Sequence, residues 1–332
     1  MSTMNRRVAT LFAAWMAALV FAAPAVADHA ADSPDNTWID RYHASIEHRL
    51  FGTSLWFDRF FVDDAIQEEL DPDSSLRWTN EFRWDQKDSF EYRFRVRARL
   101  RLPRLQGRLR LIISGENQGD PTGIRPEDPG NPGLDVGSVN RKASTELAYD
   151  LYRSGNTLVS PGVGVLVRTR PRAFVRTRFL HIRELAYSVI GRLAVIPFWQ
   201  TRDGFGVSNL LEFDRQLDLL TLLRWSNSAT ISEDTVGWEW GSEIAVLRKL
   251  SPVSAITFAA NASGTTRPVA TVQNYRVYVT YRRNFLRPWL YYELEPDVNW
   301  PREVGGGRDT VLGGTVRLEV NFTGIERHRT SR

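Results

Sequence analysis

Residues 89–103, SFEYRFRVRARLRLP, alternate strictly between arginine and apolar side chains over most of their length. Arginine occupies positions 93, 95, 97, 99 and 101, and the residues between them are aromatic or aliphatic. Successive side chains of an extended strand point to opposite faces, so this segment predicts a strand with one basic and one apolar face. Any fold that contains it must give those two faces different surroundings.

The same period of two continues from residue 76 to residue 322, interrupted by short clusters of turn-forming residues. We predict about fourteen strands, with about twelve as the alternative, because strand edges are the weakest feature of a sequence pattern. The predicted strands are residues 76–85, 89–102, 107–115, 142–152, 157–168, 173–183, 188–200, 205–214, 218–230, 235–249, 254–264, 269–284, 287–299 and 310–322.

Strand length and aromatic placement favour a membrane barrel over a soluble sandwich, which is the alternative. Many predicted strands match the roughly 9–11 tilted residues that cross a bilayer and exceed the roughly 5–6 residues of an average globular strand. Aromatic residues near strand ends are typical of the two membrane interfaces. Those aromatic residues are Trp84, Phe90, Trp199, Trp238, Trp240, Trp289, Tyr292 and Trp300. The sequence therefore predicts an all-β fold, a transmembrane antiparallel up-and-down β-barrel.

The amino terminus predicts export. Arg6 and Arg7 precede an apolar run that ends at Ala25-Val26-Ala27, which is the pattern of a cleaved signal peptide over residues 1–27. Export and a barrel together predict the cell outer membrane.

We expect three further segments in the exported chain. Residues 28–75 form a tail and a short helical segment, either periplasmic or a plug; residues 76–322 form the barrel, and residues 323–332 form a carboxyl-terminal tail. The sequence has no cysteine, which excludes disulfides and thiolate metal sites.

Several segments resemble known outer-membrane proteins. The last predicted strand, DTVLGGTVRLEVNF, is similar to the terminal strand of such proteins and finishes on Phe322. The segments FDRFFVD, LPRLQGRLRL and WLYYELEPDVNWPRE resemble an uncharacterised family of Gram-negative, porin-like outer-membrane β-barrel proteins. The resemblance implies contact with outer-membrane lipid and lipopolysaccharide, and insertion by the barrel assembly machinery. It brings no established activity and no catalytic residue.

If the apolar face meets lipid, the basic face must line the lumen. Turning the five arginines of residues 93–101 toward lipid would cost on the order of 10 kcal/mol. The predicted basic pore-lining residues are Arg93, Arg95, Arg97, Arg99, Arg101, Arg108, Arg110, Arg168, Arg176 and Arg178. The predicted acidic ones are Glu81, Glu91, Glu146, Asp150, Glu293, Glu295, Asp297 and Glu319.

This interior predicts a monomeric, passive porin-like channel that prefers small anions. One alternative is a plugged, non-conducting barrel that serves as a scaffold or partner in an envelope assembly or export complex. A third is a lipid-modifying enzyme, but His181 is the one histidine on a predicted strand and no nucleophile motif accompanies it. We therefore expect no enzymatic activity, no metal and no cofactor. Nucleic-acid binding is disfavoured because no recognised binding motif accompanies the arginines.

Overall fold

In the computed structural model, the strand-forming part of the chain is described almost throughout. Residues 1–27, which the sequence predicts to be a signal peptide, most of residues 28–73, residues 116–142, residues 168–170 and residues 324–332 lie outside the described residues. None of the described helices is long and apolar enough to cross a membrane. The described residues are 56–57, 60, 74–87, 89–102, 108–115, 143–154, 156–167, 171–201, 204–303 and 305–323.

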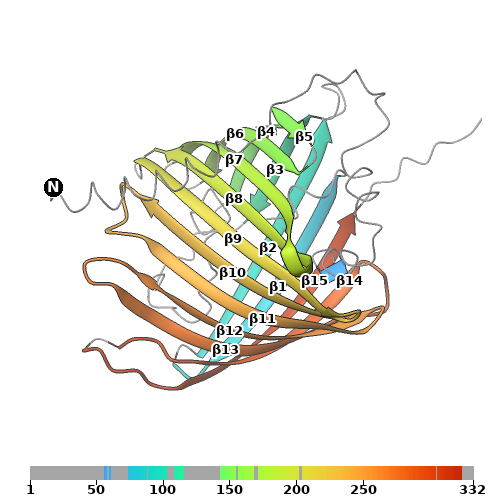
Figure 1. Ribbon diagram of the computed structural model, residues 1–332, viewed down its shortest axis with the longest axis vertical. Helices are drawn as coiled ribbons and strands as arrows, with labels where there is room; N and C mark the ends of the chain where they lie inside the picture. The colour runs from blue at the N-terminus through green and yellow to red at the C-terminus, as the bar shows by residue number, and fades with distance from the viewer. Residues whose placement is uncertain are drawn as a thin grey trace, which may run out of the picture. The chain divides into compact units, whose positions relative to one another are not determined.

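One antiparallel sheet contains all fifteen strand segments (Figure 1). The segments are β1 Ser75–Asp85, β2 Ser89–Leu102, β3 Leu109–Gly115, β4 Ala143–Tyr149, β5 Tyr152–Ser154, β6 Thr157–Val167, β7 Arg172–Leu185, β8 Val189–Gln200, β9 Gly204–Asp218, β10 Thr221–Ser232, β11 Glu239–Ser251, β12 Ser254–Thr265, β13 Thr271–Asn284, β14 Leu290–Asn299 and β15 Val311–Thr323. A short 3-10 helix, η3, spans Ala186–Ser188 between β7 and β8.

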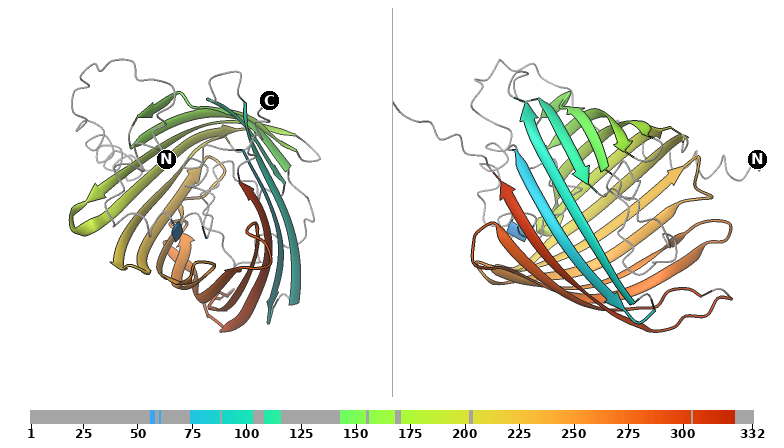
Figure 2. Two further views of the ribbon diagram at one scale, coloured as in Figure 1. Left: turned by 90° about the vertical axis from the view of Figure 1, so that its right-hand side faces the viewer. Right: turned by 180° about the vertical axis from the view of Figure 1, so that it is seen from behind.

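The sheet closes on itself as a fourteen-stranded barrel. Segments β4 and β5 are parts of one strand, because both pair with β6, through Ala148 and Gly162 in one case and Tyr152 and Val159 in the other. The first strand, β1, pairs with the last, β15, so no strand is left at an edge (Figure 2). The predicted up-and-down barrel of fourteen strands is therefore confirmed.

The predicted turn between β9 and β10 was misplaced by a few residues. The sequence pattern ended one strand at residue 214 and began the next at residue 218, whereas β9 continues to Asp218 and the turn is Leu219–Leu220. The register shifts by one residue here, since Asp218 pairs with Thr221 but Gln216 pairs with Leu222. This β-bulge at Leu217, together with apolar residues in the turn itself, obscured the boundary.

The two faces of the barrel differ as the alternation predicts. On β2, Phe90, Tyr92 and Phe94 are 64%, 50% and 45% exposed on the outside, whereas Arg99, on the other face, is 6% exposed. A polar outer residue finds a partner on the same face, because the Tyr92 hydroxyl donates a hydrogen bond to Asn80 Oδ1 at 2.8 Å. A closed antiparallel barrel with an apolar outer belt is the architecture of a transmembrane β-barrel.

Two inward-facing glycines allow aromatic rings to lie against the inner wall. Gly164 pairs across the sheet with Phe174, and Gly206 pairs with Phe198. A Cβ atom at either glycine would stand 2.3 Å from the ring of its partner, so no other residue fits. The rings cover exposed backbone and help to fix the register of these strand pairs.

The two ends of the barrel carry different connections. Ser75 pairs with Thr323, so the first and last strands begin and finish at one end, which we name the short-turn end. The turns Leu219–Leu220 and Pro252–Val253 lie there. The opposite end, which we name the long-loop end, holds the connections 116–142 and 300–310.

Replacing Phe94 by arginine should destabilise the barrel by about 2–4 kcal/mol, because the new charge would face hydrocarbon. The free energy of unfolding in lipid vesicles measures this change. Arg95→Lys, at the neighbouring inward position, is the matched control and should change stability by less than about 1 kcal/mol. Equal losses in the two variants would show that the two faces share one environment.

Candidate functional site

The arginine ladder is the set of inward-facing residues Arg93, Arg95, Arg97, Arg99 and Arg101 on β2. Their burial varies along the strand. Arg99 is buried, whereas the side chains of Arg93 and Arg95 keep 22% and 26% of their surface exposed. Guanidinium groups of the ladder therefore remain accessible to water inside the barrel.

The register places few acids beside the ladder. Arg97 pairs directly with Arg77 on β1, and Arg101 pairs with Arg110 on β3. Directly opposed like charges repel, and two of these arginines have acidic partners elsewhere: Arg77 lies 4.0 Å from Glu319, and Arg110 lies 2.8 Å from Asp150. Glu81 is the closest carboxylate on β1; its Oε1 atom lies 3.6 Å from Arg93 Nη1 and 3.7 Å from Arg95 Nη2. The wall formed by β1–β3 thus concentrates positive charge.

Strands β13–β15 and β1 carry a dense set of ion pairs, which we name the β13–β15 network. Arg282 Nη2 donates to Glu319 Oε1 at 2.9 Å and also contacts Glu293. Arg317 bridges the barrel closure, donating to Glu81 at 2.8 Å on β1 and to Glu295 at 2.8 Å on β14. The members are Arg276, Arg282, Arg317, Glu81, Glu293, Glu295, Asp297 and Glu319.

The acids of this network are among the predicted lining residues, whereas its three arginines are not among them. Arg276 and Arg282 share the inner face of β13 with Tyr278 and Thr280, and Arg317 faces inward from β15. The predicted acidic lining residues on β14 and β15 are therefore largely neutralised by these arginines. Period-two alternation in YRVYVTYRRN was a usable signal for Arg276 and Arg282, although the tyrosines on both faces weakened it.

Most other predicted lining residues also make inward ion pairs. Arg110 Nη2 donates to Asp150 Oδ1 at 2.8 Å, and Arg176 Nε donates to Glu146 Oε1 at 2.7 Å. Arg178 is buried as well.

Two predicted lining residues lie at the margins of this interior, and a third is not described. Arg108 is exposed just before β3. Glu91 is also exposed, and its Oε1 atom accepts a hydrogen bond from Arg93 Nε at 2.8 Å. Arg168 lies outside the described residues.

A second inward cluster was missed altogether. Asp214 on β9 accepts from Arg224 Nε at 2.8 Å and lies 2.8 Å from Arg192 Nη1. Both arginines and the carboxylate are buried. The residues around Arg192 are apolar on both faces, so its orientation could not be predicted from the alternation.

His181 lies on the outer face of β7, away from the charged interior. Its Nδ1 atom is 2.8 Å from Thr157 Oγ1 on β6. Within the described ranges this histidine pairs with a hydroxyl and no carboxylate orients its ring, so the arrangement of nucleophile, base and orienting acid is incomplete. Nor do the described residues contain a group of three or more histidine or acidic side chains arranged to hold a metal ion.

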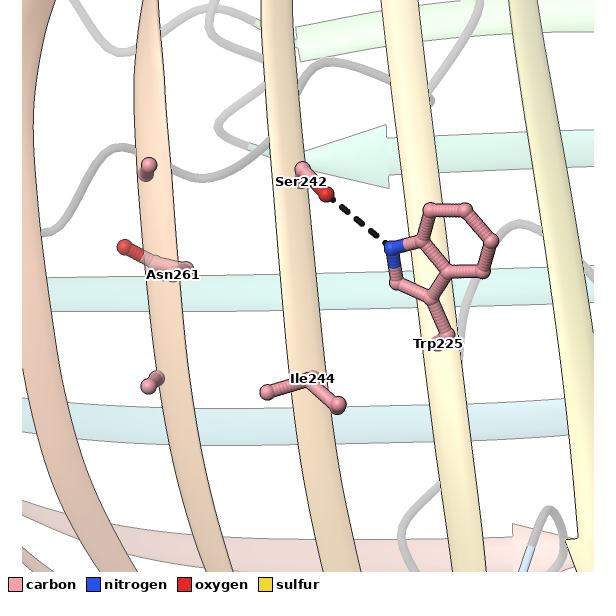
Figure 3. A pocket seen from close by; sticks show the side chains of 6 residues that line it. Trp225, Ser242, Ile244 and Asn261 are labelled. Carbon is pink, nitrogen blue, oxygen red and sulfur yellow. Dashed lines mark hydrogen bonds between the residues drawn. The ribbon is translucent and has the colours of Figure 1, made fainter.

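A shallow pocket of about 340 Å³ lies on the outer face of β10–β12 (Figure 3). Trp225 and Ile244 border it and are about half exposed. Trp225 Nε1 donates to Ser242 Oγ at 3.1 Å, and Ser242 Oγ donates to Asn227 Oδ1 at 2.8 Å. These polar side chains form hydrogen bonds with one another on an otherwise apolar face. The lining contains no titratable side chain, so the pocket offers no acid–base chemistry.

Comparisons with known proteins find solved structures of outer-membrane channels at low similarity. No family model and no curated protein matches the sequence. The outer membrane channel DcaP of Acinetobacter baumannii is 9% identical with a TM-score of 0.41, over 75% of this chain and 96% of that chain. OprB of Pseudomonas putida, in its high-pH structure, is 10% identical with a TM-score of 0.48, over 78% and 96%. Pseudomonas aeruginosa OccK10 is 9% identical with a TM-score of 0.43, over 76% and 99%. At this distance neither a solute nor a residue role is transferred.

Replacing Arg282 by methionine should lower the free energy of unfolding by about 3–5 kcal/mol, because Glu293 and Glu319 would lose a buried partner. Lys87→Met is the control, since Lys87 pairs with Glu303 at an exposed position and should contribute at most about 1 kcal/mol. Chemical unfolding in detergent measures both. If both variants lost the same small amount of unfolding free energy, the space around Arg282 would be filled with water and the pairing of Arg282 would not be buried.

Proposed function

We propose that this chain is an outer-membrane β-barrel that acts as a monomeric, passive porin-like channel with an anion-preferring lumen. The observation that supports the proposal is the arginine ladder, in which the side chains of Arg93 and Arg95 are partly exposed to the interior and few acids lie in register. Fixed positive charge on a low-dielectric wall raises the local concentration of anions and favours their passage over that of cations.

The membrane assignment is supported by the exposed apolar belt, because closed barrels span membranes without leaving backbone groups unpaired. Outer-membrane barrels have short periplasmic turns and longer extracellular loops, which orients the short-turn end toward the periplasm. In this orientation the belt contacts outer-membrane lipid and lipopolysaccharide. Insertion by the barrel assembly machinery, with Phe322 near the end of the last strand, belongs to the same proposal.

A second candidate is a plugged barrel that serves as a scaffold in an envelope complex. The observation that favours it is the burial of the β13–β15 network, in which Arg276 and Arg282 are only 2% and 1% exposed. Absence of conductance, together with a stoichiometric partner that co-purifies with the barrel, would favour this candidate. A lipid-modifying activity that is lost in His181→Ala would instead favour an enzyme.

The Arg93→Gln, Arg95→Gln double variant tests the channel. In planar bilayers, the ratio of chloride to potassium permeability should fall at least about twofold at low salt and less at high salt, because salt screens the ladder. Arg183→Gln, on the outer face of β7, is the control and should leave the ratio unchanged.

Two results would contradict the proposal in different ways. A barrel that does not conduct, even after residues 28–72 are removed, would end the channel proposal. A wild-type preference for cations would end the selectivity claim alone.

A further inference from the structure

Strands β10–β12 form an apolar region of the inner wall, which we name the apolar dock. Its residues are Leu222, Ala245, Leu247, Ala255 and Ala259, each at most 5% exposed. The register confirms that they share a face: Leu222 pairs with Leu247, and Ala245 pairs with Ala259. In a water-filled lumen such a region would be wetted at a free-energy cost, so its burial requires a cover.

The cover comes from the described helical residues that precede the barrel, namely Trp56, Phe57 and Phe60, which we name the aromatic anchor (Figure 2). Phe57 is completely buried and Phe60 is 7% exposed. The Trp56 ring stacks on Phe60, with ring centroids 4.5 Å apart and an interplanar angle of 12°. Because three alanines line the dock, bulky rings fit against the strands that carry them.

Charged residues hold the anchor from its other sides. Lys249 Nζ lies 4.3 Å from the centroid of the Trp56 ring, and the Arg282 guanidinium lies 5.7 Å from that of Phe60. The Phe60 ring also meets Tyr291 edge-on at 5.8 Å. Arg282 is itself fixed by Glu293 and Glu319. The contacts thus combine apolar burial with cation–π attraction and position the anchor firmly.

The dock lies in the short-turn half of the barrel. Leu222 lies two residues after the Leu219–Leu220 turn, and Leu247 and Ala255 lie on either side of the Pro252–Val253 turn. The sheet order separates β11 from β2 by six strand positions around a ring of fourteen, so the anchor and the arginine ladder lie on nearly opposite walls.

We propose that the aromatic anchor is a built-in constriction: the side chains of Trp56, Phe57 and Phe60 occupy the apolar dock, narrow the lumen there and confine the water path to the β1–β2 wall. The inference rests on the proposed channel. It assigns to the anchor the role of forcing permeating ions past the ladder, which a barrel open across its full width would not do.

The full-length Phe57→Ser, Phe60→Ser double variant tests this role. It should increase single-channel conductance and reduce the preference for anions, because ions could pass away from the ladder. Phe205→Ser removes an exposed aromatic residue from the outer face and is the matched control. Heat-modified mobility on a gel verifies that each barrel is folded.

A single introduced cysteine measures how accessible the dock is to water, since the chain has no cysteine of its own. Ala259→Cys should react slowly with a small charged methanethiosulfonate in the otherwise unchanged barrel. In the Phe57→Ser, Phe60→Ser background, the cysteine at position 259 should react at least about tenfold faster. A tenfold change corresponds to a loss of about 1.4 kcal/mol in the free energy with which the anchor binds the dock.

The outcomes separate this inference from the proposed function. A conducting wild type whose double-serine variant has unchanged conductance and unchanged cysteine reactivity overturns the constriction and leaves the channel intact. Faster cysteine reactivity with unchanged conductance also overturns it, because the anchor would then be structural only. A silent wild type that conducts after the double substitution supports the constriction and contradicts an open resting channel.

Discussion

Charge that cannot face hydrocarbon has to be enclosed, and this constraint organises the molecule. The arginine face of β2 can turn only toward an interior, which requires the sheet to close through the pairing of β1 with β15. Closure brings Glu81 beside Arg317, so one carboxylate connects the ladder to the β13–β15 network. Paired charges satisfy one another in the wall near the closure, while the partly exposed guanidiniums of β2 keep a local positive excess.

The sequence predicted the fold well wherever the two faces differ chemically. On β2 and β15 the alternation of charged and apolar residues determines orientation, and the strand boundaries follow within a few residues. On β12 both faces consist mainly of apolar or small residues, as in SAITFAANASG, so alternation alone does not distinguish inside from outside. The cover of that inner face comes from Trp56–Phe60, which is remote in sequence, and local periodicity carries no information about such a contact.

The interior also explains why the candidate site was only partly predictable. Acids on β14 stand out in the sequence, whereas their partners Arg276, Arg282 and Arg317 come from neighbouring strands whose register no pattern reveals. Pairing determines whether a charge stabilises the wall or remains available to a solute. The functional proposal therefore depends on the difference between a neutralised network and a ladder with few acids in register.

The central claim is that the two faces of one strand meet lipid and water. Single cysteines at positions 94 and 95, each carrying a small fluorophore, test it in vesicles that contain brominated lipid or aqueous iodide. We predict that brominated lipid quenches the label at 94 and spares the label at 95, and that iodide does the reverse. Equal quenching of both labels by iodide, with no effect of brominated lipid, would contradict the membrane barrel.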